Sequence, residues 1–263
     1  MELSFIKYQG AGNDFVILNS LNNKISLELS QSQIATICDR NFGVGGDGMI
    51  IIAPSDSADF EMLYYNADGK LGSLCGNGSR CAVYYYYEWT GRKQTEIVFS
   101  SYDGIHKAQV VGEHTIKVQM ADIEAYSYES NFYYMNTGSP HIVIFKEDID
   151  ALDMLQIGRQ YRNLSPLKEA GSNVNVVQCG GEMSFVRTFE RGVEGETLAC
   201  GTGVTAAALL KSIHEKYKAG SYKEVFKALG GILSVYFLKT ENGFKDIYLE
   251  GPAKRVFEGK IKI

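Results

Sequence analysis

Two cysteines in this chain stand in nearly the same local sequence, about half the chain apart. Cys75 lies in "LCGNGSRCA" and Cys200 in "ACGTGVTAA", so each opens a Cys-Gly-polar-Gly stretch that leads into a helix-forming segment. A cysteine just before a helix meets the positive end of the helix dipole and unpaired backbone N–H groups, which favour the thiolate. The same N–H groups can bind a carboxylate, and the glycines let a ligand approach the backbone.

Two such helix starts on either side of one cleft would suit inversion of configuration at a carbon atom. One base removes a proton from one face while an acid returns a proton to the other, and a thiolate and a thiol exchange these roles when the direction reverses. The N–H groups would stabilise the negative charge that develops on the substrate. We therefore predict that Cys75 and Cys200 form an acid/base pair.

Metal and nucleotide chemistry fit the motifs less well. Cys75 and Cys81 have C-x5-C spacing rather than the C-x2-4-C of common zinc sites, so we expect no metal site and a buried thiol at Cys81. The stretch "GVGGDG" (43–48) matches a dinucleotide-binding pattern. However, a helical pattern precedes it and a strand-like pattern follows, in the reverse of the required order, so it predicts a tight turn.

Short strands and a few helices must position these cysteines. Helical periodicity covers about residues 30–41, where Ser30 and Gln33 resemble a capping box, and it returns at about 79–88, at 151–162 with Asp150 as N-cap, and at 204–220. Strand-like segments occupy much of the remainder. The repeated rhythm predicts an α+β fold built from two similar halves, with the boundary near residues 122–130.

Length and composition exclude several other classes of protein. The 263 residues suffice for two domains. The net charge is -5 and no basic block is present, so the sequence offers no basic surface that would attract nucleic acid or an anionic membrane. No apolar run reaches the roughly 18 residues of a membrane span, and the first residues lack a signal-peptide pattern. Five cysteines leave at least one unpaired, so we expect a reducing cytoplasm rather than a disulfide scaffold.

Over nearly its whole length, the chain resembles the diaminopimelate epimerases, a family of cofactor-independent amino-acid epimerases of the lysine and peptidoglycan pathway. The resemblance rests on motifs that occur in the family's order: "GAGNDF", "DRNFGVGGDG", "YNADG", "CGNGSRC", "NTGSPH", "NVNVV", "FERGVEGET" and "ACGTG". It implies interconversion of LL- and meso-diaminopimelate without pyridoxal phosphate or metal, and a homodimer. It also implies two halves, each a mostly antiparallel sheet wrapped around a central helix, with the active site between them. We place these halves at 1–124, with the last strand 253–263 returning to it, and at 125–252.

The resemblance also implies roles for individual residues. Cys75 and Cys200 match the acid/base cysteines, and His141 and Glu190 match positions thought to tune their ionisation. The matched substrate-binding positions are Asn13, Asn66, Gly76, Asn77, Asn173, Glu190, Arg191, Gly201 and Thr202. Taken singly, the asparagines also fit turns or strand ends and His141 a structural histidine, but their order along the chain favours function.

Two residues depart from the family's pattern. Ser139 stands where many members have Asn, so its contact to the substrate's distal group is expected to be shorter or water-mediated. Gly48 stands where some members place Gln, and that contact is expected to be absent.

Three other functions remain as alternatives. A proline racemase-like enzyme of the same superfamily tends to carry His after the first Cys-Gly, where this chain has Asn77, and it needs no anchors for a second amino-acid group. A non-catalytic binding protein would have lost at least one cysteine, and both are present. A structural zinc module is the remotest of the three.

Overall fold

The computed structural model describes residues 1–22, 29–72, 75–129, 131–164 and 170–263, so Leu74 of the first cysteine motif lies outside the described residues. The chain forms two compact units, Met1–Val118 with Gly251–Ile263, and Gln119–Glu250. The boundary thus falls a few residues before the expected position at 124/125. It does so because Met120 N–H bonds to the carbonyl of Ile247 and Ile123 pairs with Phe244, which draws this stretch into the second unit.

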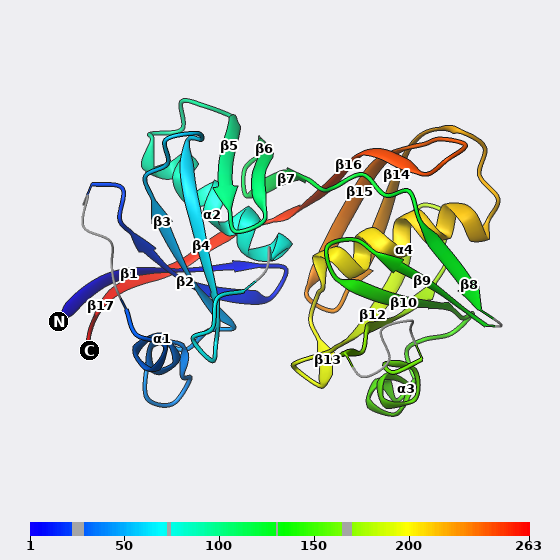
Figure 1. Cartoon of the computed structure of the whole chain (residues 1–263), viewed down its shortest axis with the longest axis horizontal. Coiled ribbons are helices and arrows are strands. Elements are labelled where there is room, and N and C mark those ends of the chain that lie inside the picture. Colours follow the sequence, from blue (N-terminus) through cyan, green and yellow to red (C-terminus); the bar gives the residue numbers. More distant parts are fainter. Residues whose placement is uncertain (23–28, 73–74, 130, 165–169) are drawn as a thin grey trace. The chain divides into compact units, whose positions relative to one another are not determined.

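In the first unit, one continuous ladder of strands runs in the order β17, β1, β2, β3, β4, β5, β6, β7. Neighbours are antiparallel except for β2–β3 and β4–β5, which are parallel. The pairing of β1 with β17 places both chain termini in this unit (Figure 1). The elements are β1 (Glu2–Gly10), β2 (Asn13–Asn19), α1 (Gln31–Cys38), β3 (Gly48–Ala53), β4 (Phe60–Asn66), α2 (Gly76–Trp89), β5 (Glu96–Ser101), β6 (Gly104–Gly112), β7 (Thr115–Gln119) and β17 (Lys254–Lys262).

The second unit repeats this pattern of pairing. Its ladder runs β8, β9, β10, β11, β12, β14, β15, β16, and only β10–β11 and β12–β14 are parallel. The elements are β8 (Tyr126–Glu129), β9 (Phe132–Asn136), β10 (Pro140–Phe145), α3 (Met154–Tyr161), β11 (Asn173–Gln178), β12 (Ser184–Glu190), β13 (Gly195–Thr197), α4 (Gly201–His214), β14 (Gly220–Ala228), β15 (Gly231–Lys239) and β16 (Phe244–Pro252). The predicted α+β fold of two similar, mostly antiparallel halves is confirmed.

Each unit wraps its strands around one long helix (Figure 1). Helix α2 contacts β1, β2, β3, β4, β6 and β17, and α4 contacts β9, β10, β11, β12, β14 and β15. Ala82 and Val83 of α2 are fully buried, as is the whole stretch 206–210 of α4. Burial of apolar surface is the main stabilising term in folding, so packing against the strands holds these two helices in place. It thereby also positions the first residues of each helix.

The helix boundaries correct some of the sequence expectations. The capping box of α1 is present, with Ser30 and Gln33 bonding reciprocally. Helix α3 begins after Asp153 rather than Asp150, because the Asp153 carboxylate accepts the N–H of Gln156. Helix α4 ends at His214, well before Gly220, since Lys216 adopts a left-handed backbone with φ 57°. Within the described residues, no helix is long and apolar enough to cross a membrane.

Candidate active site

Cys75 is the N-cap residue of α2, with an extended backbone. Its carbonyl accepts the N–H of Ser79 at 2.7 Å, which starts the helix. Its sulfur accepts the N–H of Gly78 at 3.4 Å, and its thiol donates to Asn13 Oδ1 at 3.7 Å. The hydrogen bond from Gly78 stabilises a thiolate, because an N–H can only donate. The hydrogen bond to Asn13 stabilises a thiol, because an amide oxygen can only accept. This environment therefore accommodates both protonation states of the cysteine.

A buried arginine fixes the side chain beside Cys75. Arg80 is completely buried and donates to Asn77 Oδ1 at 2.7 Å and to the Gly76 carbonyl at 3.2 Å. The Asn77 amide nitrogen is thereby turned toward Asn13, whose Oδ1 accepts it at 3.2 Å. Burial lowers the pKa of Arg80 to about 10, which leaves the guanidinium charged at neutral pH beside the start of α2.

Asn13 is oriented in turn by a carboxylate. Its amide nitrogen donates to Asp47 Oδ2 at 2.5 Å, so its Oδ1 must face Asn77 and Cys75. Arg40 bridges Asp47 and Asp14, with N···O distances of 2.7 Å to each. Burial alone would raise the pKa of Asp14, but hydrogen bonds from Arg40 and Lys7 outweigh it and lower the pKa to about 2. Through this carboxylate, the "GVGGDG" stretch that contains Asp47 supports the orientation of Asn13.

Asn66 ends β4 directly opposite Gly48 of β3. The hydroxyl of Tyr64 donates to Asn66 Oδ1 at 3.1 Å. A Cβ atom on Gly48 would lie 2.7 Å from the Tyr64 ring and 2.6 Å from the Tyr65 carbonyl, and one on Gly72 would lie 2.5 Å from the same ring. The tyrosine ring thus occupies the space that a longer side chain at position 48 would need, which gives a physical reason for the departure at Gly48.

Cys200 is the N-cap residue of α4, the counterpart of Cys75 in the second unit. Its carbonyl accepts the N–H of Val204 at 2.9 Å. Its sulfur lies 3.4 Å from the hydroxyl oxygen of Thr202. The carbonyl of Thr202 accepts the hydroxyl of Thr137 at 2.8 Å, which ties the first turn of α4 to the loop after β9. The side chain of Thr202 therefore contacts the sulfur of Cys200.

His141 is fully buried behind Thr202. Its Nε2 lies 2.9 Å from Thr202 Oγ1, and its Nδ1 lies 3.0 Å from the amide nitrogen of Asn175. Burial, together with the positive charge of Arg191, lowers the pKa of His141 to about 3. The imidazole is consequently neutral at physiological pH, so it acts here through hydrogen bonds rather than as a charge.

The remaining matched residues of the second unit lie around the end of β12. Asn173 is buried at the start of β11, and its Oδ1 accepts the backbone N–H of Arg191 at 3.0 Å. The Arg191 guanidinium donates to the Ala170 carbonyl at 3.3 Å. Glu190 accepts the hydroxyl of Thr197 at 2.5 Å. These contacts bring Asn173 and Arg191 together directly.

Ser139 lies in the turn between β9 and β10, where its carbonyl accepts the N–H of Thr137 at 3.1 Å. Sequence reasoning missed three side chains that orient the matched residues, namely Asp47, Tyr64 and Asn175. A signal for Asn175 was present in "NVNVV", because alternation along a strand places Asn173 and Asn175 on the same face. Nothing comparable marks Tyr64, whose role depends on cross-strand pairing.

Known proteins provide an independent comparison for these two half-sites. The family model described as diaminopimelate epimerase matches residues 5–125 and 133–256. The chain belongs to the diaminopimelate epimerase family. It is similar to the diaminopimelate epimerase of Flavobacterium psychrophilum, with 38% identity over 98% of this chain and 100% of the relative. It is also similar to the diaminopimelate epimerase of Aquifex aeolicus, with 34% identity over 98% of each.

Solved structures share the fold of this diaminopimelate epimerase family member at much lower identity. A phenazine biosynthesis protein of the PhzF family from Bacillus anthracis has a TM-score of 0.79 and 16% identity, covering all of both chains. A hydroxyproline epimerase from Agrobacterium vitis has a TM-score of 0.67 and 12% identity, covering 99% of this chain and 92% of the other. Likeness at this level establishes the fold alone.

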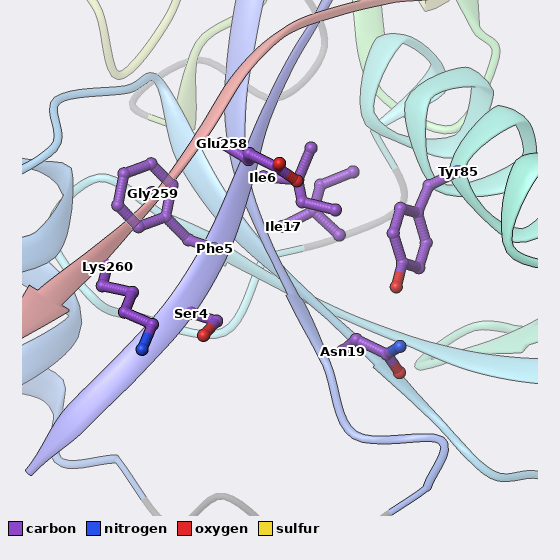
Figure 2. A pocket seen from close by; sticks show the side chains of 9 residues that line it. All are labelled: Ser4, Phe5, Ile6, Ile17, Asn19, Tyr85, Glu258, Gly259 and Lys260. Atoms are coloured by element: carbon purple, nitrogen blue, oxygen red, sulfur yellow. The ribbon is translucent and has the colours of Figure 1, made fainter.

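Figure 2 shows a surface hollow in the first unit that Cys75 does not line. It has a volume of about 450 Å³ and is lined by Phe5, Ile6, Ile17 and Tyr85, with Asn19 and residues 258–260 at its sides. Figure 2 shows Tyr85 entering it from α2 while the other side chains come from the strands. Phe257 of β17 packs edge-on against Phe5 and is 47% exposed. None of the matched substrate-binding residues lines this hollow.

Proposed function

We propose that the protein interconverts LL-diaminopimelate and meso-diaminopimelate, as a cofactor-independent epimerase of lysine and peptidoglycan precursor synthesis. The observation that carries the proposal is that each unit caps its central helix with a cysteine whose sulfur meets hydrogen-bonding groups of its own unit. Family membership at 38% identity over nearly the whole chain supports the substrate. The two units would present these cysteines to opposite faces of one carbon.

In the proposed mechanism, the thiolate of one cysteine takes the proton from the α-carbon, and the thiol of the other gives a proton to the opposite face. The electron pair left on carbon is delocalised into the adjacent carboxylate. Backbone N–H groups of Gly76 and Asn77, with those of Gly201 and Thr202, would hold that carboxylate and stabilise the added charge. Each turnover leaves the two cysteines with their protonation states exchanged, so the pair is ready for the reverse reaction. The scheme uses no pyridoxal phosphate and no metal.

We assign recognition of the distal amino and carboxylate groups to the remaining matched residues. Amide side chains can satisfy both groups, and the guanidinium of Arg191 can pair with a carboxylate through two parallel hydrogen bonds. The fixed orientations of Asn13 and Asn173 support this assignment, because a preorganised amide loses little entropy on binding. The distal set is Asn13, Asn66, Asn173, Glu190 and Arg191, with Ser139 at its edge.

We further propose that the protein is a homodimer, as the family resemblance implies, and that it is cytoplasmic, as its cysteine usage indicates. All five cysteines are free thiols, in keeping with a reducing compartment. Phe257 is half-exposed and packs edge-on against Phe5, which lines the apolar hollow of Figure 2. Together with Val256, which is 56% exposed, it offers apolar surface for a second copy. Sedimentation of the wild type and of Phe257→Asp would test the dimer, and a monomeric wild type would refute it.

Reaction in deuterated water tests the activity. The protein should convert LL-diaminopimelate to the meso form and place one deuterium at the inverted α-carbon. A parallel screen with proline and simple amino acids should show no conversion, whereas conversion of proline alone would identify a proline racemase-like enzyme. Cys75→Ala and Cys200→Ala should both abolish turnover, and full turnover in either variant would refute the two-cysteine mechanism.

A further inference from the structure

Asn175 lies in the middle of β11, fully buried, and its amide nitrogen lies 3.0 Å from Nδ1 of His141. Its amide nitrogen donates to the Ile142 carbonyl at 3.1 Å, and its Oδ1 accepts the Thr188 hydroxyl at 2.9 Å. The carbonyl of Ile142 can only accept a hydrogen bond, so the nitrogen of the amide must be on that side. The orientation of the Asn175 amide is therefore determined by its neighbours.

This orientation decides the tautomer of His141. The same amide nitrogen lies 3.0 Å from His141 Nδ1, so Nδ1 must be the acceptor of that hydrogen bond. In a neutral imidazole the other nitrogen then carries the proton, and Nε2–H donates to Thr202 Oγ1 at 2.9 Å. The pKa of His141, lowered to about 3 by burial and by Arg191, keeps the ring in this neutral state.

The tautomer in turn sets the direction of the last hydrogen bond. Thr202 Oγ1 already accepts the His141 proton, so its own hydrogen is left for Cys200 Sγ at 3.4 Å. The opposite tautomer would draw the Thr202 hydrogen onto Nε2 and would leave only an acceptor for the Cys200 thiol. A hydrogen bond donated to sulfur stabilises the thiolate, and one accepted from it stabilises the thiol.

We infer that Asn175 is a positioning residue of the epimerase: it fixes the Nε2–H tautomer of His141 so that the Thr202 hydroxyl donates to the sulfur of Cys200. Space for this arrangement is left by Gly203 of α4, where a Cβ atom would collide with Asn175 Oδ1. The consequence for catalysis rests on the proposed function, whereas the direction of the hydrogen bonds does not.

Nitrogen NMR of the histidine rings in the intact protein tests the tautomer without any turnover. The chain has four histidines, so His141→Gln identifies the His141 signals by their loss. We expect an unprotonated Nδ1 and a protonated Nε2 in the wild type. A protonated Nδ1 in the wild type would overturn the inference, and this measurement needs no variant of Asn175.

Asn175→Asp then tests the effect on Cys200. A carboxylate at this position accepts from Nδ1–H and reverses the tautomer, so kcat should fall about 10- to 100-fold while KM changes less than about threefold. In a Cys75→Ser background, the ultraviolet absorbance of thiolate at neutral pH should also decrease. That absorbance reports Cys200, because burial raises the pKa of Cys38 and Cys179 to about 11 and also raises that of Cys81.

Ser212→Ala is the matched control, since it removes one buried hydrogen bond, to the Leu209 carbonyl, near the far end of α4. It should lower stability but leave kcat, the His141 signals and the thiolate absorbance unchanged. A reversed tautomer in Asn175→Asp with wild-type kcat and wild-type thiolate absorbance would overturn the inference. A wild type that shows the expected tautomer but does not epimerise diaminopimelate would instead refute the proposed function and keep the hydrogen-bond assignment.

Discussion

The hydroxyl oxygen of Thr202 lies 3.4 Å from the sulfur of Cys200, two residues away at the start of the same helix. The same oxygen meets Nε2 of the buried His141 at 2.9 Å. This short chain of contacts reaches the sulfur from inside the second unit. The protonation of Cys200 can therefore be influenced by residues that a substrate need not touch.

Removal of the Thr202 hydroxyl should slow the reaction. Thr202→Val keeps the branched shape but cannot donate to Cys200, so kcat should fall about 10- to 100-fold, the cost of losing a hydrogen bond to a charged group. Thr202→Ser keeps the hydroxyl and should retain most of the activity. Steady-state kinetics of both variants test this. Equal kcat values for Thr202→Val and the wild type would contradict a role for the Thr202 hydroxyl in the reaction.

Replacement of Asp47 should weaken substrate binding more than chemistry. Asp47→Asn removes the charge that holds the amide of Asn13 at 2.5 Å, and the substituted amide could present either a donor or an acceptor to it. We expect KM to rise roughly tenfold with a smaller change in kcat. Asp103→Asn, which breaks an exposed pair with His106 in the same unit, is the control and should leave KM unchanged.

Gly48 should tolerate no side chain. In Gly48→Ala the new Cβ would lie 2.6 Å from the Tyr65 carbonyl and 2.7 Å from the Tyr64 ring, so we expect a loss of about 1–3 kcal/mol in unfolding free energy. Urea denaturation measures it. Gly181→Ala provides the matched control, because a Cβ there meets nothing within 4 Å. Similar urea midpoints for Gly48→Ala and Gly181→Ala would show that β4 moves aside at little cost, and would contradict this expectation.

The buried His141 should make stability depend on pH. Its folded pKa of about 3 lies below the ordinary value of 6.5, so between these values the unfolded chain binds a proton that the folded chain does not. The contribution of His141 to the free energy of unfolding is therefore fully present above pH 6.5. It decreases as pH falls below that value, by at most about 1.4 kcal/mol per pH unit. Denaturation of the wild type and His141→Gln at several pH values isolates it. Parallel curves for the two proteins would contradict the expectation.

Mild oxidation should inactivate the enzyme by joining Cys75 to Cys200. The proposed mechanism requires the two sulfurs to approach opposite faces of one carbon atom, so without substrate they should be able to form a disulfide that a thiol reductant reverses. Mass spectrometry of the digested protein identifies the linkage. We expect no disulfide between Cys75 and Cys81, because Cys81 is fully buried within α2. Finding that disulfide instead of Cys75–Cys200 would argue against the proposed arrangement.

Local physics allowed much of the candidate site to be predicted from the sequence. A Cys-Gly-polar-Gly stretch before a helical segment already implies a cysteine at the helix N-cap, and both Cys75 and Cys200 are N-caps. The capping box at Ser30 and the strand after "GVGGDG" follow from the same short-range rules. Helix ends were less predictable, because the Asp153 cap and the left-handed Lys216 depend on which competing local hydrogen bonds form.

The sequence by itself determined the pair of cysteines, the two similar halves and the family, since these depend on residue types in order along the chain. Only the tertiary structure decided which side chains orient them. Asn175 reaches His141 because β11 lies parallel to β10, and Tyr64 fills the space beside Gly48 because β4 lies antiparallel to β3. Hydrogen-bond direction depends on contacts among several strands at once, and no spacing within a single segment encodes such contacts.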